Sequence, residues 1–187
     1  MRNLRPFTSY SLTGMAKCVF LDRDGVLNED RTDYVYRVED FVIPDGVVEG
    51  LRQLKEAGYL LIVVTNQAGI AKGLYTRDDV MRCHHYLQER CGHLIDDIYF
   101  SPHHPDYDTR SLTRKPDSLL LEKAIAKYNI DVNQSWMIGD AARDMYAGKR
   151  VGVRTVHVRQ TPSQPVEGDW EASCLLEATE RVISDKS

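Results

Sequence analysis

Two aspartates one residue apart, Asp22 and Asp24, follow an apolar run and precede Gly25. The run, residues 18–21, is short and rich in strand formers, so it predicts a buried strand. Two carboxylates at the end of such a strand repel each other unless a cation or a shared proton lies between them. Mg²⁺ suits this position, because it takes one or two carboxylates and keeps coordination positions for phosphate oxygens. The pattern therefore predicts magnesium-assisted chemistry on a phosphate group.

A calcium-binding loop or a solvated turn is the structural alternative for the same acids. An EF-hand loop that starts at Asp22 needs glycine at its sixth position and glutamate at its twelfth. Those positions hold Leu27 and Asp33, and a strand rather than a helix precedes them. We therefore favour the catalytic interpretation.

Neutral hydrogen-bonding groups follow a second apolar run, residues 60–65. Thr65, Asn66 and Gln67 supply one hydroxyl and two amides, which can donate to phosphate oxygens. Such turns are common in proteins, so this signal alone fits local structure as well as function.

A pair of cations, Arg114 and Lys115, stands just before Pro116 and a predicted helix. A cation at a helix entry can neutralise the charge of a transferring phosphoryl group. Taken alone, however, an Arg–Lys pair more often belongs to a solvated surface.

A further pair of acids follows the apolar run at residues 135–139. Asp140 comes directly after the run, and Asp144 lies one helical turn later. Acids in these places would complete a metal site with Asp22 and Asp24, although Asp140 could also act as a helix N-cap. The four signals occur in order at strand ends and helix entries, and their conjunction favours one phosphate-handling site.

The elements that must position these residues follow a β–α alternation, which predicts an α/β fold with a mainly parallel sheet covered on both faces. The predicted strands cover about residues 17–22, 60–65, 95–100, 135–139 and 153–158. The predicted helices start at Pro44-Asp45, at a Thr76–Asp79 capping box, at Pro116 and near Ala141. A surface loop at 159–171 is expected before a last helix that contains Leu175 and Ile183.

Composition limits the classes of function. The 187 residues fit one domain, and we expect a flexible tail at 1–14 before a single domain at 15–187. A net charge of −4 without a basic run argues against nucleic acid, and no apolar run reaches the length of a membrane span. Four scattered cysteines without a CxxC pair fit reduced thiols in the cytoplasm.

Together these motifs resemble those of the haloacid dehalogenase superfamily of phosphohydrolases. The resemblance covers about residues 17–160 and rests on Asp22-Arg-Asp24-Gly25, Thr65, Lys115 and Gly139-Asp140-x-x-x-Asp144. It implies a Rossmann-like three-layer α/β/α sandwich, and the segments between the motifs are too short for a separate cap domain. More narrowly, the chain is similar to the members that remove the 7-phosphate of D-glycero-D-manno-heptose 1,7-bisphosphate. Those members serve nucleotide-heptose biosynthesis for lipopolysaccharide or S-layer glycans.

The resemblance also implies roles for the residues. Asp22 would attack phosphorus and form an aspartyl-phosphate, and Asp24 would act as general acid and then as general base. Mg²⁺ would be held by Asp22, by Asp24 through its backbone carbonyl, and by Asp140. Thr65 and Lys115 would hold phosphoryl oxygens, with Asp144 supporting Lys115 or a metal-bound water. We expect the substrate contacts to come from Asn28, Asn66, Gln67, Arg114 and His103.

The chain departs from this group in the long loop at 101–113. Many members hold a structural zinc there with Cys-x-His and Cys-x-Cys, whereas the matching places here are Ser101, His103, Ser111 and Thr113. Serine and threonine are not among the usual zinc ligands, so we predict no structural zinc. The loop must then be ordered by packing, by Pro102 and Pro105, or by the substrate. Ala141 stands where these enzymes often carry lysine, which leaves the preferred substrate and anomer open.

The sequence leaves two alternative functions open. A histidinol-phosphate phosphatase shares much of the pattern, but the Arg114 fork suits a second phosphate group. A non-catalytic module that binds a phosphosugar or a metal would be free to lose Asp22 or Asp24, and both are present. A polynucleotide phosphatase is disfavoured, because it would need a basic groove and the chain has no basic run. We expect the protein to be cytoplasmic. We also expect it to be a monomer, because an open site without a cap needs no second subunit to complete it.

Overall fold

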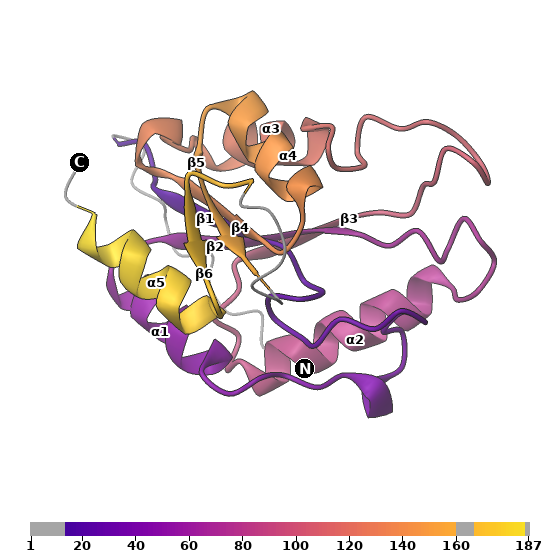
Figure 1. The fold of residues 1–187 in the computed structure, drawn as a ribbon. Helices are drawn as coiled ribbons and strands as arrows, with labels where there is room; N and C mark the ends of the chain where they lie inside the picture. The colour runs from indigo at the N-terminus through magenta and orange to yellow at the C-terminus, as the bar shows by residue number, and fades with distance from the viewer. Residues whose placement is uncertain (1–13, 160–166, 186–187) are drawn as a thin grey trace, which may run out of the picture.

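The computed structural model describes residues 14–159 and 167–185. A parallel six-stranded sheet forms its middle layer, in the order β3-β2-β1-β4-β5-β6 (Figure 1). The strands are β1 (Cys18–Leu21), β2 (Leu60–Asn66), β3 (Asp97–Ser101), β4 (Trp136–Gly139), β5 (Arg154–Val158) and β6 (Trp170–Ala172).

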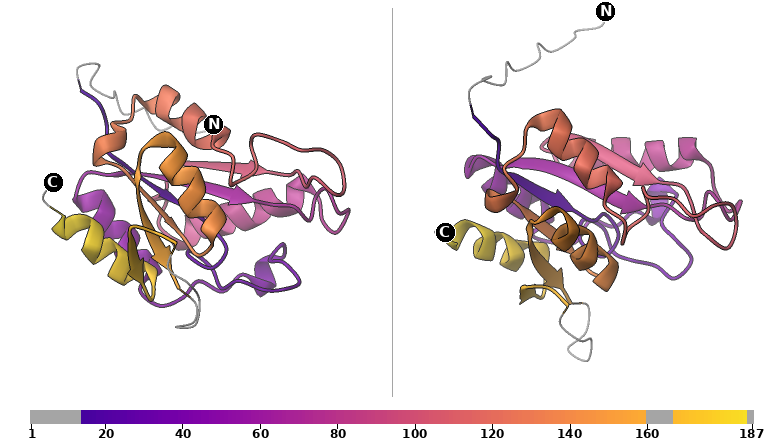
Figure 2. Two further views of the ribbon diagram at one scale, coloured as in Figure 1. Left: turned by 45° about the horizontal axis from the view of Figure 1, so that its top comes forward. Right: turned by 90° about the horizontal axis from the view of Figure 1, so that it is seen from above.

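Helices cover both faces of the sheet, which confirms the predicted three-layer α/β/α sandwich (Figures 1 and 2). One face carries α1 (Val47–Glu56), α2 (Arg77–Arg90) and α5 (Leu175–Ser184). The other face carries α3 (Leu119–Tyr128) and α4 (Ala142–Val151). Two short 3₁₀ turns, η1 (Val38–Asp40) and η2 (Val132–Gln134), lie in the connections.

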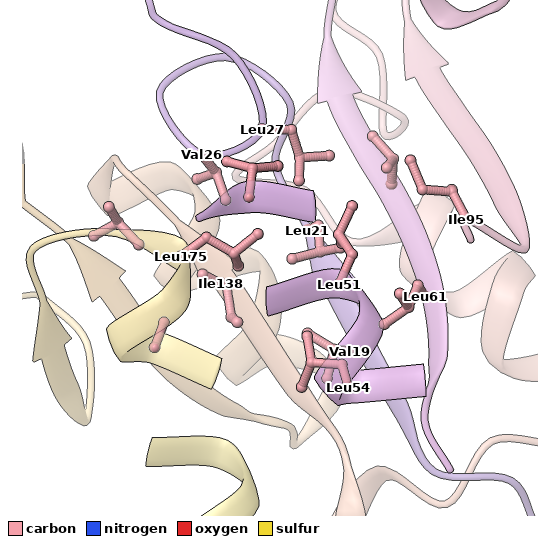
Figure 3. Close-up of a cluster of buried hydrophobic side chains, with 14 of the residues drawn as sticks. Val19, Leu21, Val26, Leu27, Leu51, Leu54, Leu61, Ile95, Ile138 and Leu175 are labelled. Atoms are coloured by element: carbon pink, nitrogen blue, oxygen red, sulfur yellow. The ribbon is translucent and has the colours of Figure 1, made fainter. Parts of the chain in front are cut away.

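Strand β1 shows why a continuous apolar run was required. Val19 and Leu21 face the cluster that includes Leu51 of α1 (Figure 3). Phe20 faces the cluster that includes Leu121 of α3. Successive side chains of a strand point to opposite faces, so both faces of β1 must be apolar. Complete burial of such side chains stabilises the fold by about 1.5–3 kcal/mol each. This packing fixes the strand whose end carries the first two acids.

The sheet order also places the site. The chain moves from β1 through β2 to β3 on one side, and then returns to β4 on the other side of β1. In open parallel sheets, ligands bind beyond the carboxyl ends of the strands at such a reversal. The backbone N–H of Asp22 donates to the carbonyl of Ile138 at 2.9 Å, which extends the β1–β4 pairing to the reversal point. The acids after β1 and β4 therefore meet at one edge of the sheet.

The expected capping box is confirmed at the start of α2. The Thr76 side chain accepts from the backbone of Asp79 at 3.2 Å, and the Asp79 carboxylate accepts from the Thr76 N–H at 2.7 Å. Two other helices begin a few residues later in the chain than predicted. Helix α1 begins at Val47 because Gly46, with φ of 86°, precedes it in the left-handed region. Helix α3 begins at Leu119 because residues 114–117 form a turn.

The predicted loop at 159–171 was wrong in one part. Residues 170–172 form strand β6, which pairs in parallel with β5 at the sheet edge. This three-residue strand is too short to show an apolar alternation, so the sequence pattern did not reveal it. Residues 160–166 and most of the predicted tail, 1–13, lie outside the described residues, and the tail stays a prediction.

The connections around the site are compact. Between β1 and β2 the described chain holds only η1 and α1, and between β2 and β3 it holds only α2, so no cap domain is inserted at either place. In the described ranges, no helix has the length and apolar character needed to cross a membrane.

Candidate active site

A buried lysine joins two of the predicted acids. Lys115 Nζ lies 2.9 Å from Asp22 Oδ1 and 2.6 Å from Asp144 Oδ1, and it donates to the carbonyl oxygen of Val64 at 2.6 Å. The Lys115 side chain is fully buried. We call Asp22, Lys115 and Asp144 the charge centre. A buried cation needs such partners, because an unpaired charge in the interior is costly.

Burial and mutual repulsion shift the acids of this site. Burial first, and the charge of Asp144 second, raise the pKa of Asp22 to about 6. Burial, followed by the charges of Asp22 and Asp144, raises the pKa of Asp140 to about 7. Burial alone would lower the pKa of Lys115, but Asp144 and Asp22 raise it above its ordinary value. The site thus concentrates negative charge that a single lysine does not offset.

The acids fit a divalent cation. Oxygen atoms of Asp22, Asp140 and Asp144 all lie within 4.8 Å of one another. Asp140 Oδ1 is buried without a hydrogen-bond partner, so it is free for a metal. Asp144 is less free, because its Oδ2 accepts from the N–H of Ala141 at 3.1 Å and its Oδ1 contacts Lys115. An all-oxygen donor set suits Mg²⁺, and Asp22 with Asp140 are its best side-chain ligands here.

Gly25 allows this approach of the two strand ends. Its φ is 79°, in the left-handed region, and a Cβ built on it would lie 2.2 Å from Asp140 Oδ2. Any side chain at position 25 would therefore displace the Asp140 carboxylate. Gly139 plays the same part for Asp144, since its Cβ would lie 2.3 Å from the Asp144 Cβ.

Asp24 is held in a ring of donors outside the metal cluster. Its Oδ1 accepts from Arg23 Nη2 at 2.8 Å and from Asn28 Nδ2 at 3.0 Å, and its Oδ2 accepts from Gln67 Nε2 at 3.0 Å. Burial alone would raise the pKa of Asp24, but the charge and hydrogen bonds of Arg23, with those of Asn28 and Gln67, lower it below its ordinary value. Asp24 is thus held ionised, the form that accepts a proton.

A tyrosine fixes the direction of the Gln67 amide. Tyr75 Oη donates to Gln67 Oε1 at 2.9 Å and accepts from the Gly69 N–H at 3.2 Å. The amide nitrogen of Gln67 must then point the other way, toward Asp24 and toward Thr65 Oγ1 at 3.0 Å. Because Thr65 accepts from Gln67, its own hydroxyl hydrogen remains available to a phosphoryl oxygen.

Asn66 holds the backbone of the lysine. Its Oδ1 accepts from the Lys115 N–H at 3.0 Å, and its Nδ2 donates to the Lys115 carbonyl at 3.0 Å. The end of β2 is therefore fastened to a residue 49 positions later in the chain. This reciprocal pair positions Lys115 beside Asp22.

A cavity of about 300 Å³ opens beside Asp24. Arg114, Arg143, His104 and Tyr34 are among the residues that line it, together with Asn66. A larger cavity, about 560 Å³, lies between the starts of α1 and α5 on the side of Gly25. The smaller cavity is the candidate substrate site, because Asp24 lines it together with Arg114 and Arg143. Arg31 lines it as well, but its guanidinium group is paired with Asp33 at 2.9 Å.

The structure divides the five residues expected to contact substrate. Asn66 and Arg114 line the cavity. Asn28 and Gln67 are 0% and 1% exposed, and both donate to Asp24. His103 Nδ1 is paired with Asp108 Oδ2 at 2.6 Å, and its neighbour His104 lines the cavity instead.

Arg143, like Arg23 and Tyr75, is a site residue to which the sequence analysis gave no role. It lies between Asp140 and Asp144, and its Nη2 is 4.0 Å from Asp140 Oδ1. The i, i+3 spacing from Asp140 and the position in the first turn of a helix were visible signals. A cation at a helix start is disfavoured by the helix dipole, which makes its presence there informative.

Hydroxyl groups occupy the loop positions where zinc ligands would stand. Thr113 Oγ1 lies 2.9 Å from Ser101 Oγ and 2.8 Å from Ser111 Oγ. We call Ser101, Ser111 and Thr113 the hydroxyl cluster. Asp108 adds a second tie, because it accepts from the His104 N–H at 2.8 Å as well as contacting His103. Neutral hydrogen bonds thus connect the two ends of the loop.

The sequence of the chain is similar to those of known phosphatases. A family model described as HAD-hyrolase-like matches residues 112–172. The D-glycero-beta-D-manno-heptose-1,7-bisphosphate 7-phosphatase of Haemophilus ducreyi is 40% identical over 169 residues, which cover 86% of this chain and 92% of the relative. The D-glycero-alpha-D-manno-heptose-1,7-bisphosphate 7-phosphatase of Burkholderia mallei is 40% identical over 147 residues, 74% of this chain and 77% of the relative. The chain belongs to the haloacid dehalogenase (HAD) phosphatases.

A solved structure supports the same assignment. The D,D-heptose 1.7-bisphosphate phosphatase of B. bronchiseptica, complexed with magnesium and phosphate, has a TM-score of 0.80 and 26% identity. The match covers 89% of this chain and 98% of that one. This HAD phosphatase is therefore an enzyme, a phosphoric monoester hydrolase, as the motifs predicted. The relatives carry both anomers in their names, so they leave the anomer open.

Proposed function

We propose that this HAD phosphatase removes the 7-phosphate of D-glycero-D-manno-heptose 1,7-bisphosphate in nucleotide-heptose biosynthesis. The observation that carries the proposal is the cavity in which Arg114 and Arg143 lie beside Asp24, next to the charge centre. A substrate with two phosphate groups needs two cationic sites, and Lys115 and the two arginines supply them. The names of the relatives support the choice of sugar.

In the first step, Asp22 attacks phosphorus. A bond forms between a carboxylate oxygen and phosphorus, and the bond from phosphorus to the sugar oxygen breaks. Asp22 Oδ1 is occupied by the Arg23 N–H at 2.7 Å and by Lys115, which leaves Oδ2 as the attacking atom. Lys115 and Thr65 would hold the phosphoryl oxygens as charge develops on them.

Asp24 moves the protons. When the phosphate dianion approaches, its negative charge raises the pKa of the Asp24 carboxyl group, which takes up a proton from solvent. Asp24 gives this proton to the departing sugar oxygen, and then takes one from the water that hydrolyses the aspartyl-phosphate. Gln67, Asn28 and Arg23 keep the group oriented through both steps.

Mg²⁺ would be held by Asp22, Asp140 and, as the resemblance implies, the backbone carbonyl of Asp24. It would screen the attacking carboxylate from its anionic target. Asp144 would position Lys115. All four cysteines are free thiols, which supports a cytoplasmic location. We further propose that the enzyme acts as a monomer, with a phosphosugar as its ligand and without a structural zinc.

Phosphate release with Mg²⁺ tests the proposal across a panel of substrates. The panel holds both anomers of heptose 1,7-bisphosphate, histidinol phosphate, fructose 1,6-bisphosphate and an aryl phosphate. We expect one heptose anomer to be preferred, and Asp22→Asn to reduce its turnover by at least about 10⁴-fold. Preference for histidinol phosphate would overturn the substrate assignment. Turnover that survives in Asp22→Asn would overturn the mechanism.

A further inference from the structure

Three arginines line the cavity beside Asp24, and one of them, Arg31, is paired with Asp33 at 2.9 Å and with Asp40 at 3.5 Å. The other two come from different elements. Arg114 comes from the segment before α3, and Arg143 from the first turn of α4. The Arg143 side chain is 44% exposed, in contrast to the fully buried Lys115. Both side chains line the same cavity, and burial, followed by the charge of Arg143, lowers the pKa of Arg114 below its ordinary value. Without an anion between them, these groups repel each other.

Neither guanidinium group is fully used by the protein. Arg114 Nη1 donates to the carbonyl oxygen of His103 at 3.3 Å, and Arg143 approaches Asp140 at 4.0 Å. Within residues 14–159 and 167–185, no carboxylate lies within hydrogen-bond distance of either group. Each group therefore retains N–H donors that no described carboxylate occupies, and both residues line the cavity. Guanidinium groups donate in a fixed fork that matches phosphate oxygens.

We propose that Arg143 is a specificity-determining residue, which binds with Arg114 the phosphate group that is not hydrolysed. The inference rests on the proposed function, because it concerns the second phosphate of the same substrate. Lys115 and Thr65 are each 1% exposed, and under the proposed function they would hold the reacting phosphate. A substrate that has only one phosphate leaves the two arginines without their shared anion.

One competing role for Arg143 must be separated by experiment. Its charge also acts on Asp22, whose pKa it lowers, although burial has the larger and opposite effect. If Arg143 served mainly to keep Asp22 ionised, its removal would slow every substrate equally. If it binds the second phosphate, its removal would affect bisphosphates selectively.

The test compares substrates that differ by one phosphate group. Wild type, Arg143→Ala and Arg143→Lys are assayed for kcat/KM with heptose 1,7-bisphosphate and with heptose 7-phosphate. We expect the preference for the bisphosphate to fall about 10- to 100-fold in Arg143→Ala, mainly through KM, as for loss of a charge-assisted contact. Arg143→Lys should recover part of the preference, since it keeps the charge but not the fork.

Arg150→Ala is the matched control. Arg150 lies on the same helix with a similar exposure, 51%, but pairs with Asp117 and does not line the cavity. The control should keep the wild-type preference. An equal fall for both substrates in Arg143→Ala, or no fall, would overturn the inference.

A binding measurement separates this inference from the proposed function. Heptose 1-phosphate carries only the phosphate that remains after hydrolysis, and calorimetry should show about 10- to 100-fold weaker binding to Arg143→Ala than to wild type. If wild type fails to hydrolyse heptose bisphosphate, the proposed function fails. The inference is then decided by the relative binding of fructose 1,6-bisphosphate and fructose 6-phosphate to the same variants. An unchanged ratio would overturn it.

Discussion

The charge centre and the hydroxyl cluster stand at the two ends of one short segment, residues 113–115. The charge centre holds a fully buried lysine between two carboxylates. The hydroxyl cluster holds three neutral hydroxyl groups, of which that of Ser101 is buried and those of Ser111 and Thr113 are partly exposed. Both connect parts of the chain that are distant in sequence. They differ in the free-energy cost of losing a hydrogen-bond or ion-pair partner.

This difference in cost predicts which residues tolerate substitution and which do not. A buried charge cannot lose its partner without a large penalty, whereas a half-exposed hydroxyl can bond to water instead. The charge centre should therefore be intolerant of substitution, and the hydroxyl cluster tolerant.

Lys115→Met should have the largest effect. It leaves Asp22 and Asp144 buried without a cation, which costs about 3–5 kcal/mol of stability. Turnover should fall at least about 10³-fold, because the phosphoryl group loses its buried cation. Lys123→Met, at an exposed position on α3, is the control and should leave both unchanged. Denaturant unfolding and phosphate release measure the two effects, and a small loss of both would remove the contrast.

Mg²⁺ should stabilise the protein more at pH 8 than at pH 5. In the metal-free protein the pKa values of Asp22 and Asp140 are about 6 and about 7, above the value of 3.8 for free Asp. The folded state therefore keeps protons that the unfolded chain has lost, and its stability falls as pH rises through this interval, by up to about 1.4 kcal/mol per group and pH unit.

The metal takes the place of these protons, so its benefit grows as they leave. Thermal unfolding with EDTA and with Mg²⁺ at the two pH values measures the difference. Asp140→Asn should show a smaller Mg²⁺ effect at pH 8. An equal rise in Tm at both pH values would contradict the prediction.

Tyr75→Phe should have an intermediate effect. It leaves Gln67 Oε1 and the Gly69 N–H without their partner, at a cost of about 1–3 kcal/mol. The Gln67 amide can then rotate away from Asp24, so we expect kcat to fall by up to about tenfold with little change in KM. Tyr86→Phe on α2 serves as the control. Wild-type kcat in Tyr75→Phe would show that packing alone orients the amide.

Ser111→Ala should have the smallest effect. Thr113 keeps its bond to Ser101, so the loss should be about 0.5–1.5 kcal/mol of stability. We expect kcat/KM to stay within about threefold of wild type, because Lys115 is held independently by Asn66. A tenfold loss of activity would mean that the hydroxyl cluster and the charge centre act as one unit.

The sequence located the charged residues of the candidate site better than their supports. Asp22 and Asp140 were placed because the strand ends of a parallel sheet meet at one edge, and strand ends follow from apolar runs. Lys115 was placed by its position just before a predicted helix. The burial of Asn28 and Gln67 was not predictable, since an amide in a loop carries no sign of which group it will meet. Arg143 was missed because it lies between two acids and resembles a local ion pair.

The doubled attachment of the 101–113 loop has a consequence for how this enzyme could be altered. Ser101 and Thr113 meet at 2.9 Å, and Asn66 grips Lys115 just beyond them. The loop therefore leaves and rejoins the fold at one point. The entropic cost of closing a loop grows slowly with its length. Longer or foreign segments should be accepted between residues 104 and 110 without moving Lys115, which makes this loop a grafting site for new substrate preferences.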